Sequence, residues 1–411
     1  MLGPARTRAW GALALVALLV LTACGATPAT TTPVATTAAP GGAATAAATR
    51  ATSPAATTGS PAAGAARAAT PATRAASPAA SPRPGSPVAA SPVAVDQGPC
   101  TSANAERRQP SGRQRLVIAT GGTGGVFFPY GGGVARILSA RMQNTEATAE
   151  VTGGSVDNMK LVGAGDADIG MSTADSALEA FEGQGVYRDT GKIPACTIAN
   201  LYQSFIHVVA LDGAGVNSIP DMKGKRVSVG SAGSSTEVAA DRLMEVAGLN
   251  PRTDVQRDNL SVAESVAAMK DRKIVAFFWI GGLPTAAVTD LVATPNLKVR
   301  FISTEQYLQQ MRQRYGPVYT AFALPRATYA GLEADVPGIG VGNIFFVNAK
   351  MPEQQVYDIL TTIFNNLGEV QGVHPEAKTL SIETAARGSS IPFHPGAIRF
   401  YTEKGVWRGG Q

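Results

Sequence analysis

The sequence predicts an α/β protein with a mainly parallel sheet, and three features support this. Short apolar runs of strand type alternate with stretches in which apolar residues return every three or four positions. Strand, helix and strand follow one another closely between residues 149 and 172, as in a βαβ unit. Glycine-rich or serine-rich loops separate strand from helix at several junctions. In parallel sheets ligands bind beyond the carboxyl ends of the strands, so these loops are the candidate site.

The first loop lies in IATGGTGGVFFPY, residues 118–130. The apolar run 116–118 reads as a strand, and Val134 and Ile137 follow at helical spacing. Glycines let the backbone approach a ligand closely, and the amides of the next helical turn favour an anion. No Gly-Lys-Ser/Thr follows, which excludes a P-loop, and Phe127 stands where the dinucleotide fingerprint needs its third glycine. A purely structural strand–helix turn remains an alternative.

The segment 149–154 reads as a strand that ends in a second glycine loop. Ser155 is expected to cap the helix that follows, and Asn158, one turn further on, can face either the loop or solvent. The next strand, 169–172, runs into small polar residues at 172–176. The three loops would therefore lie together at one edge of the sheet.

The second half of the folded region repeats this pattern. Strands are expected at 206–211 and 226–230, and the second opens into Ser-Ala-Gly-Ser-Ser-Thr at 231–236. Ser234 and Glu237 have the spacing of a capping box. Such a helix start suits a carboxylate, although a serine of this kind is more often only a cap.

Further elements continue to the C-terminus. Ser261 and Glu264 form another capping box, and the apolar run 274–280 is typical of a buried parallel strand. Trp279 precedes two glycines, where its ring covers a ligand or fills the core. A strand is expected at 341–347, an amphipathic helix at 352–368 and a last helix at 397–405.

The N-terminus reads as a secretory signal. Residues 1–23 combine two arginines, an apolar stretch and a small-residue end. The apolar stretch is too short to span a bilayer comfortably. The Leu-Thr-Ala-Cys that ends at Cys24 resembles a bacterial lipobox, which implies cleavage before Cys24, lipid on its sulfur and an exported, membrane-anchored protein. The alternative is an ordinary signal peptide followed by an incidental cysteine.

Residues 24–113 read as the lipidated cysteine and a disordered tether. Ala, Thr, Pro, Ser and Gly dominate, so the segment cannot bury enough apolar surface to offset chain entropy. Its seven arginines outnumber Asp96 and Glu106 by five, and the signal carries two more. Since the whole chain has a net charge of +5, residues 114–411 carry −2. A nucleic-acid partner therefore has no electrostatic support in the folded part.

The remaining cysteines, Cys100 and Cys196, form an even pair in an exported chain, which permits a disulfide as an alternative to two free thiols. Such a bond would join the end of the tether to the folded part. No Cys-x-x-Cys or His-x-x-x-His occurs, so no metal site is expected. Three histidines have no obvious serine or carboxylate partner and are expected to be structural: His207, His374 and His394.

Five stretches occur in a fixed order: ATGGTGGVFFP at 119–129, TGGSVDN at 152–158, DMKGKRVSVG at 221–230, AFF at 276–278 and IPFHPG at 391–396. Together they resemble the TAXI family of TRAP-transporter solute receptors. The similarity covers about residues 115–405, essentially the whole folded part. Two departures stand out, since Val275 replaces a usual aspartate and Ser231-Ala232 replaces a proline-containing loop start.

The resemblance implies a two-lobed, type II-like periplasmic-binding-protein fold, each lobe a mostly parallel sheet flanked by helices, with the ligand cleft between the lobes. Lobe 1 would comprise residues 114–211 and 320–411 and lobe 2 residues 212–319, with hinges near Leu211 and within 315–322. The protein would be a monomeric, lipid-anchored receptor facing the periplasm or cell exterior. It would pass an acidic amino acid, a 2-oxo acid or a dicarboxylate to an ion-driven TRAP permease, with no cofactor and no catalysis.

The motif positions give a set of candidate ligand-binding residues. No arginine stands in the loops, and Arg188 and Arg242 are candidates only by default, each expected to be a surface charge. The expected ligand-binding residues are Gly122, Thr123, Gly124, Phe127, Tyr130, Ser155, Asn158, Ser172 and Asp175 in lobe 1, and Ser234, Ser235, Thr236 and Trp279 in lobe 2.

Two other functional classes stay open. An exported enzyme could use the same fold, but no nucleophile–base pair and no paired acidic residues stand out. A ligand-sensing lipoprotein that signals through a membrane receptor would share every binding residue, so the sequence does not separate it from a transport receptor.

Overall fold

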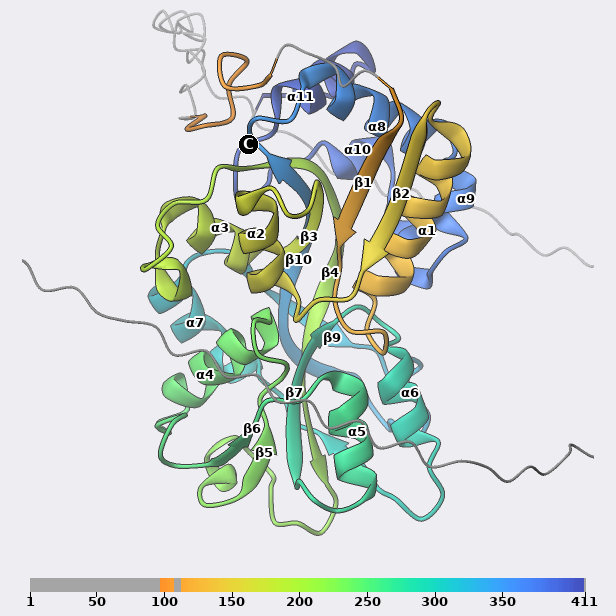
Figure 1. Ribbon diagram of the computed structural model, residues 1–411. Coiled ribbons are helices and arrows are strands. Elements are labelled where there is room, and N and C mark those ends of the chain that lie inside the picture. The colour runs from red at the N-terminus through yellow and green to blue at the C-terminus, as the bar shows by residue number, and fades with distance from the viewer. Residues whose placement is uncertain (1–96, 107–111, 410–411) are drawn as a thin grey trace, which may run out of the picture. The chain divides into compact units, whose positions relative to one another are not determined.

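The computed structural model describes residues 97–106 and 112–409, all within the unit Val88–Gln411 (Figure 1). The predicted signal peptide, Cys24 and most of the predicted tether lie outside the described residues. Within the described ranges, no helix combines the length and apolar character needed to cross a membrane.

The described residues form ten strands in one mixed sheet. The strands are β1 (Gln114–Ala119), β2 (Thr145–Glu150), β3 (Ile169–Thr173), β4 (Ala195–Leu211), β5 (Arg226–Ser228), β6 (Gln256–Asp258), β7 (Ala276–Gly281), β8 (Val299–Phe301), β9 (Tyr319–Leu324) and β10 (Val336–Asn348). The α-helices are α1 (Phe127–Arg141), α2 (Ser155–Ala164), α3 (Ala174–Glu182), α4 (Ser235–Val246), α5 (Val262–Lys270), α6 (Ala286–Val292), α7 (Leu308–Tyr315), α8 (Glu353–Asn365), α9 (Leu367–Gln371), α10 (Ile382–Ala385) and α11 (Pro395–Glu403). Short 3-10 turns are η1 (Gly185–Tyr187), η2 (Pro220–Met222), η3 (Glu305–Tyr307) and η4 (Pro375–Thr379).

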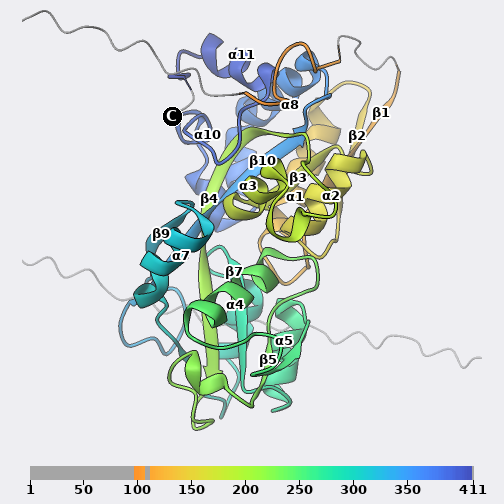
Figure 2. The same ribbon diagram turned by 90° about the vertical axis from the view of Figure 1, so that its left-hand side faces the viewer.

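The sheet consists of two parallel groups joined by long antiparallel strands. β1 pairs in parallel with β2 and β3, and β5 pairs in parallel with β6 and β7. Between these groups, β10 runs antiparallel to β3 and β4, and β4 runs antiparallel to β7. β8 and β9 extend the pairing from β4 and β10. Figure 2 shows β4 as the long strand that runs from one group into the other.

Each parallel group has a core on both of its faces, which is the layered arrangement of an α/β domain. In the first group, α1, α8 and α11 contribute to one core, and α2 and α3 contribute to the other. In the second group, α4 lies on one side, and α5 and α6 lie on the other (Figure 1). The predicted fold class, α/β with two lobes of mostly parallel sheet flanked by helices, is therefore confirmed.

The packing gives crossing points that differ from the expected hinges. On β4, Tyr202 packs in the first group and Phe205 in the second. On β10, Val341 packs in the second group and Ile344 in the first. Leu211, expected at a hinge, packs inside the second group. The reason is that β4 is continuous and passes from the first group to the second between Tyr202 and Phe205, well before it ends at Leu211. We infer that lobe 1 comprises residues 112–204 and 342–409 and lobe 2 residues 205–341.

Four local expectations need correction. The strand expected at 149–154 is only the end of β2, which stops at Glu150. The strand expected at 206–211 is the second half of β4. The helix expected at 352–368 is divided at Asn366 into α8 and α9. Ser155 does not cap α2, because the capping position falls on Gly154, whose φ of 126° and ψ of −148° suit only glycine. The Ser155 hydroxyl is thereby left for other contacts.

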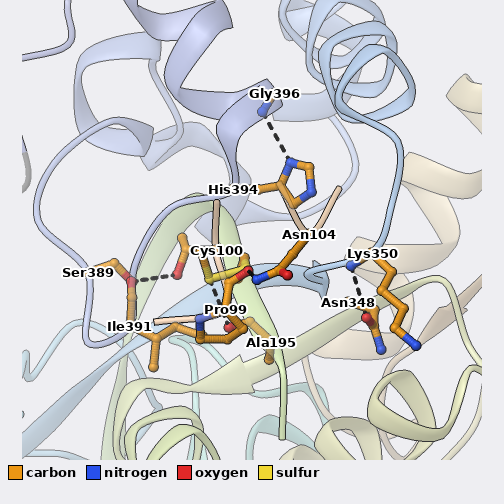
Figure 3. The surroundings of a disulfide bond; sticks show 12 residues. Pro99, Cys100, Asn104, Ala195, Asn348, Lys350, Ser389, Ile391, His394 and Gly396 are labelled. Atoms are coloured by element: carbon orange, nitrogen blue, oxygen red, sulfur yellow. Dashed lines mark hydrogen bonds between the residues drawn. A yellow bond between two sulfur atoms is a disulfide. The ribbon is translucent and has the colours of Figure 1, made fainter. Parts of the chain in front are cut away.

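Cys100 and Cys196 form a disulfide with a Cα–Cα distance of 5.7 Å (Figure 3). Cys196 lies on β4, and both cysteines pack against Ala349 just beyond β10. A backbone hydrogen bond of 3.0 Å from Glu106 to the Lys350 carbonyl holds the same segment. The described end of the predicted tether is thus fixed to lobe 1.

Candidate ligand-binding site

A cavity of about 40 Å³ lies between the two lobes. Its wall is made of small, hydroxyl-bearing and aromatic residues. Tyr202 is the one titratable side chain in this wall, as far as the described residues extend. The lining residues are Gly121, Gly122, Gly125, Val126, Phe127, Gly153, Gly154, Ser155, Thr173, Tyr202 and Ser204 from lobe 1, and Ser231, Ser234, Ser235, Thr236, Ser261, Val262, Trp279, Ile280 and Gly281 from lobe 2.

Five helices of the described chain begin at this cavity. The capping residues of α1 to α5 are Val126, Gly154, Thr173, Ser234 and Ser261, and each of them lines the wall. The first amides of a helix have no carbonyl partner within it, and the helix dipole places partial positive charge there. Three helix starts from lobe 1 and two from lobe 2 therefore direct positive potential into one small space, which suits an anion.

Part of the cavity wall is aromatic. Trp279 lies at the end of β7, and its indole Nε1–H donates to the Thr285 hydroxyl at 2.9 Å. On the lobe 1 side, Tyr202 is buried and its hydroxyl has no hydrogen-bond partner among the described residues. Burial, reinforced by the Glu376 carboxylate, raises the pKa of Tyr202 well above its ordinary value. Tyr202 thus stays neutral and keeps an O–H group that can donate to a ligand.

The lobes also touch each other around the cavity. The Asp157 amide donates to the Gly233 carbonyl at 3.1 Å. The hydroxyl of Ser155 donates to that of Ser235 at 3.2 Å and accepts the Thr173 amide at 3.1 Å. These contacts join the two lobes around the cavity, which is the arrangement expected of a closed state.

A further bond between the lobes involves Glu376, whose carboxylate accepts the Leu283 amide. Burial raises the pKa of Glu376, and the Leu283 amide opposes that shift. Leu283 belongs to lobe 2 and Glu376 to η4 of lobe 1, so this contact also joins the two lobes.

Seven of the thirteen predicted ligand-binding residues line the cavity and six do not. Both groups include residues from the first glycine loop. Those in the wall are Gly122, Phe127, Ser155, Ser234, Ser235, Thr236 and Trp279; those outside it are Thr123, Gly124, Tyr130, Asn158, Ser172 and Asp175.

The residues outside the wall have structural contacts instead. Asn158 donates to the carbonyls of Thr120 and Met171, both at 2.7 Å, which ties the start of α2 to β1 and β3. Tyr130 is fully buried and stacks on Tyr202 with ring centroids 6.0 Å apart, so it supports the wall from behind.

The other four predicted residues outside the cavity wall also lie at positions that explain why they do not reach the cavity. The Ser172 hydroxyl donates to the neighbouring Thr173 carbonyl at 3.1 Å. Thr123 is exposed, and Gly124 lies against Ala287 of lobe 2. Asp175 is buried against Arg242 and accepts one of its N–H groups at 3.2 Å.

The expectation that Arg242 is a surface charge is wrong. Its side chain is 7% exposed and bonds to Asp175, Glu179 and Tyr319. The periodicity of α4 gave no sign of this, because its acidic partners come from a distant helix. Arg188, by contrast, is exposed as expected.

Sequence reasoning missed several wall residues. Tyr202 and Ser204 lie within the long strand β4, where no loop signal marks them. Ser261 was identifiable as a cap, and its capping box with Glu264 is confirmed. Ser261 could have been predicted as a wall residue by comparison with Ser234, the cap of α4. Both serines stand at a helix start that follows a parallel strand.

Solved structures similar to this chain include extracytoplasmic binding proteins. The alkanesulfonate-binding protein SsuA from Xanthomonas axonopodis pv. citri, bound to MOPS, is 14% identical with a TM-score of 0.36, and the match covers 73% of this chain and 82% of that one. SsuA from Escherichia coli is 12% identical with a TM-score of 0.36, covering 72% and 80%. The amino acid ABC transporter substrate-binding protein AbpA from Streptococcus pneumoniae, bound to L-arginine, is 14% identical with a TM-score of 0.39, covering 64% and 94%.

At the level of sequence families, residues 118–405 match the NMT1-like family. This range includes all of lobe 2, most of lobe 1 and every residue of the cavity wall. The chain belongs to the NMT1-like family.

Proposed function

We propose that this protein is an extracytoplasmic solute receptor that closes its two lobes around a small organic anion. The observation that carries the proposal is the convergence of five helix starts on one interlobe cavity whose wall has no basic side chain among the described residues. An anion would then be held by backbone amides and hydroxyls rather than by an arginine. The ligand classes that fit are an acidic amino acid, a 2-oxo acid or a dicarboxylate.

Closure of the two lobes would provide most of the affinity for the anion. Hydrogen bonds from amides to a carboxylate are charge-assisted, and they strengthen when water leaves the site. The walls from both lobes are needed for this, because Ser155 and Tyr202 come from lobe 1 while Ser235 and Trp279 come from lobe 2. A ligand that bridges the lobes favours the closed state over the open one by its differential affinity.

The destination of the ligand is the finer part of the proposal. The TAXI-like motifs at 119–129, 152–158 and 391–396 support delivery to a TRAP-type permease driven by an ion gradient. The lipobox-like sequence at Cys24 supports anchoring of the receptor to the outer face of the membrane. In cells, uptake of the identified anion should then collapse when ionophores dissipate the proton and sodium gradients, and it should survive ATP depletion; the opposite pattern would remove the TRAP assignment.

The ligand class is tested by thermal unfolding of the purified chain after refolding to remove any bound ligand. The panel contains glutamate, 2-oxoglutarate, succinate, malate and fumarate, with sugars and amines as controls. A ligand at about 100 times its Kd adds about 2.7 kcal/mol, which raises Tm by a few degrees. A shift confined to sugars or amines, or no shift with any member, would overturn the anion assignment.

The binding site is tested by a matched set of variants. Ser235→Ala removes a cavity hydroxyl and should reduce the ligand-induced Tm shift. Thr123→Val alters the same kind of group in the glycine loop but outside the cavity, so its shift should equal that of the wild type. Equal ligand-induced Tm shifts in both variants would show that the ligand binds outside this cavity.

A further inference from the structure

We propose that Arg242 is a positioning residue for lobe closure, because it neutralises the buried Asp175 and the partly buried Glu179, which only the closed arrangement brings against it. The interlobe cluster consists of Arg242 on α4, Tyr319 on β9, and Asp175 and Glu179 on α3. Arg242 and Tyr319 belong to lobe 2 and the two acids to lobe 1. None of the four lines the cavity, so an effect on ligand binding would act through closure.

All of the contacts in the interlobe cluster involve or surround the guanidinium group of Arg242. Arg242 Nη1 donates to the Tyr319 hydroxyl at 2.7 Å and to Asp175 Oδ2 at 3.2 Å. The Tyr319 hydroxyl donates in turn to the same Asp175 oxygen at 2.8 Å. Arg242 Nη2 bonds to Glu179, and the guanidinium lies 4.8 Å from the centroid of the Tyr315 ring. One lobe 2 cation thus meets both lobe 1 carboxylates.

The effect of losing the Arg242 cation depends on how deeply the interlobe cluster is buried. The side chains of Arg242 and Asp175 are 7% and 1% exposed, and Tyr319 is fully buried. A buried ion pair is not strongly stabilising in itself, because desolvation offsets most of the attraction. Removal of one partner is different, since it leaves an uncompensated buried charge. Without Arg242, closure would hold Asp175 and Glu179 beside each other with no cation from lobe 2, whereas opening would hydrate them.

α4 links the cluster to the cavity. The same helix begins at Ser234 and Ser235 in the cavity wall and carries Arg242 about two turns further on. Val238, between these positions, packs against the lobe 1 core cluster that contains α2 and α3 residues. α4 is one rigid helix. When Arg242 binds the two lobe 1 acids, the start of α4 therefore approaches lobe 1 in the same movement.

The chain contains a matched control, an arginine that pairs with two acids of the same helix α4. Arg257 is also largely buried and bonds to Glu237 and Asp241 of α4, both at 2.7 Å. Arg257 lies in β6, so all three residues belong to lobe 2. Loss of this ion-pair group should reduce stability without changing lobe closure.

The first measurement needs no ligand. Nitroxide labels at Val151→Cys, a 58% exposed position just after β2, and Ala286→Cys, an exposed position at the start of α6, report the distance between the lobes in the full chain. We expect Arg242→Met to shift the distance distribution to longer values and Tyr319→Phe to shift it less in the same direction. Arg257→Met should leave it unchanged.

A neutral triple variant keeps the proposal testable even if Arg242→Met folds poorly. Asp175→Asn, Glu179→Gln and Arg242→Met together remove the charges at nearly constant volume, so they should restore the short interlobe distance. If Arg242→Met and Arg257→Met lower stability alike and neither changes the distance, Arg242 has only a structural role and the proposal is overturned. Failure of the triple variant to restore closure would also overturn it.

The second measurement rests on the proposed function. With an anion from the panel, Arg242→Met should raise Kd by about tenfold or more, corresponding to about 1.4 kcal/mol, and the triple variant should recover most of this loss. If no anion binds the wild type, the proposed function fails while the label distances still test the role of Arg242. If the anion binds wild type and Arg242→Met equally, the link between the cluster and affinity fails.

Discussion

Gly125 and Trp279 approach so closely across the lobe boundary that a Cβ built on Gly125 would lie 2.8 Å from the indole Cη2. Gly125 belongs to the first glycine loop and Trp279 to the end of β7. The hydrogen bond from the indole to Thr285 holds the ring in place. The closed arrangement therefore needs glycine at position 125, because the ring occupies the space of a side chain.

We predict that Gly125→Ala favours the open state. The added methyl meets the indole at a distance that Cβ atoms do not tolerate, so either the ring or the lobe must move. The interlobe label distance between positions 151 and 286 should lengthen, and an anion that binds the wild type should bind more weakly. Gly122→Ala is the control for the label distance, because its Cβ would meet only Ser261 Cβ at 3.8 Å. Equal distances in the two variants would show that the contact does not limit closure.

Neighbouring glycines of α1 predict opposite effects of one substitution on stability. A Cβ at Gly131 would lie 2.5 Å from Thr120 Cγ2, whereas a Cβ at Gly132 would have only Ala149 Cβ at 4.0 Å. Gly132→Ala should stabilise the protein by about 0.5–1 kcal/mol through helix propensity. Gly131→Ala should destabilise it by about 1–3 kcal/mol through overpacking against Thr120, which directly follows β1. Urea midpoints at constant m-value distinguish the two, and a change of the same sign in both would contradict the packing argument.

The elements that the sequence predicted well are those with local signals. Ser261 and Glu264 are three residues apart, and both bonds of their capping box are present. At α4 the Ser234 hydroxyl accepts the Glu237 amide as expected, but the Glu237 carboxylate bonds to Arg257 instead of completing the box. A distant arginine changed the second half of that motif, which spacing alone could not show.

The parts that the sequence did not predict depend on long-range packing. Asp175 and Arg242 are 67 residues apart, and only the approach of α3 to α4 turns an expected ligand residue and an expected surface charge into one buried pair. Tyr202 enters the cavity wall because β4 crosses between the lobes, and in the sequence it stands just before the expected strand 206–211 with no glycine or helix start beside it. Helix starts were recognisable one by one, whereas their convergence is a property of the assembled sheet.

Loss of the disulfide should lower stability substantially. Cys100 and Cys196 are 96 residues apart, so their bond restricts a large loop in the unfolded chain. The double variant Cys100→Ala, Cys196→Ala should lose about 2–5 kcal/mol of unfolding free energy, measured by urea titration. Reductant should destabilise the wild type and leave the double variant unchanged. If reductant affects neither protein, the bond does not constrain the unfolded chain.

Acid stability should depend on His394, the fully buried N-cap of α11, whose Nδ1 accepts the Gly396 amide at 3.1 Å. Burial lowers its pKa from 6.5 to about 4. Between these values the unfolded chain binds a proton that the folded chain does not, so the free energy of unfolding falls as pH decreases from about 6.5 to about 4. One such group accounts for up to about 3 kcal/mol over this window.

His394→Asn isolates this effect, because asparagine can accept the same amide as an N-cap and cannot take up the proton. We expect the variant to resemble the wild type in its urea midpoint at pH 7.5, about one unit above the unfolded pKa, and to lose less stability on acidification. His207, also buried with its pKa lowered to about 4, remains and should preserve part of the slope. The control is His374→Asn at the half-buried cap of η4, where the smaller burial predicts a smaller change. If the His394 variant declines with acid as steeply as the wild type, the buried imidazole does not govern acid stability.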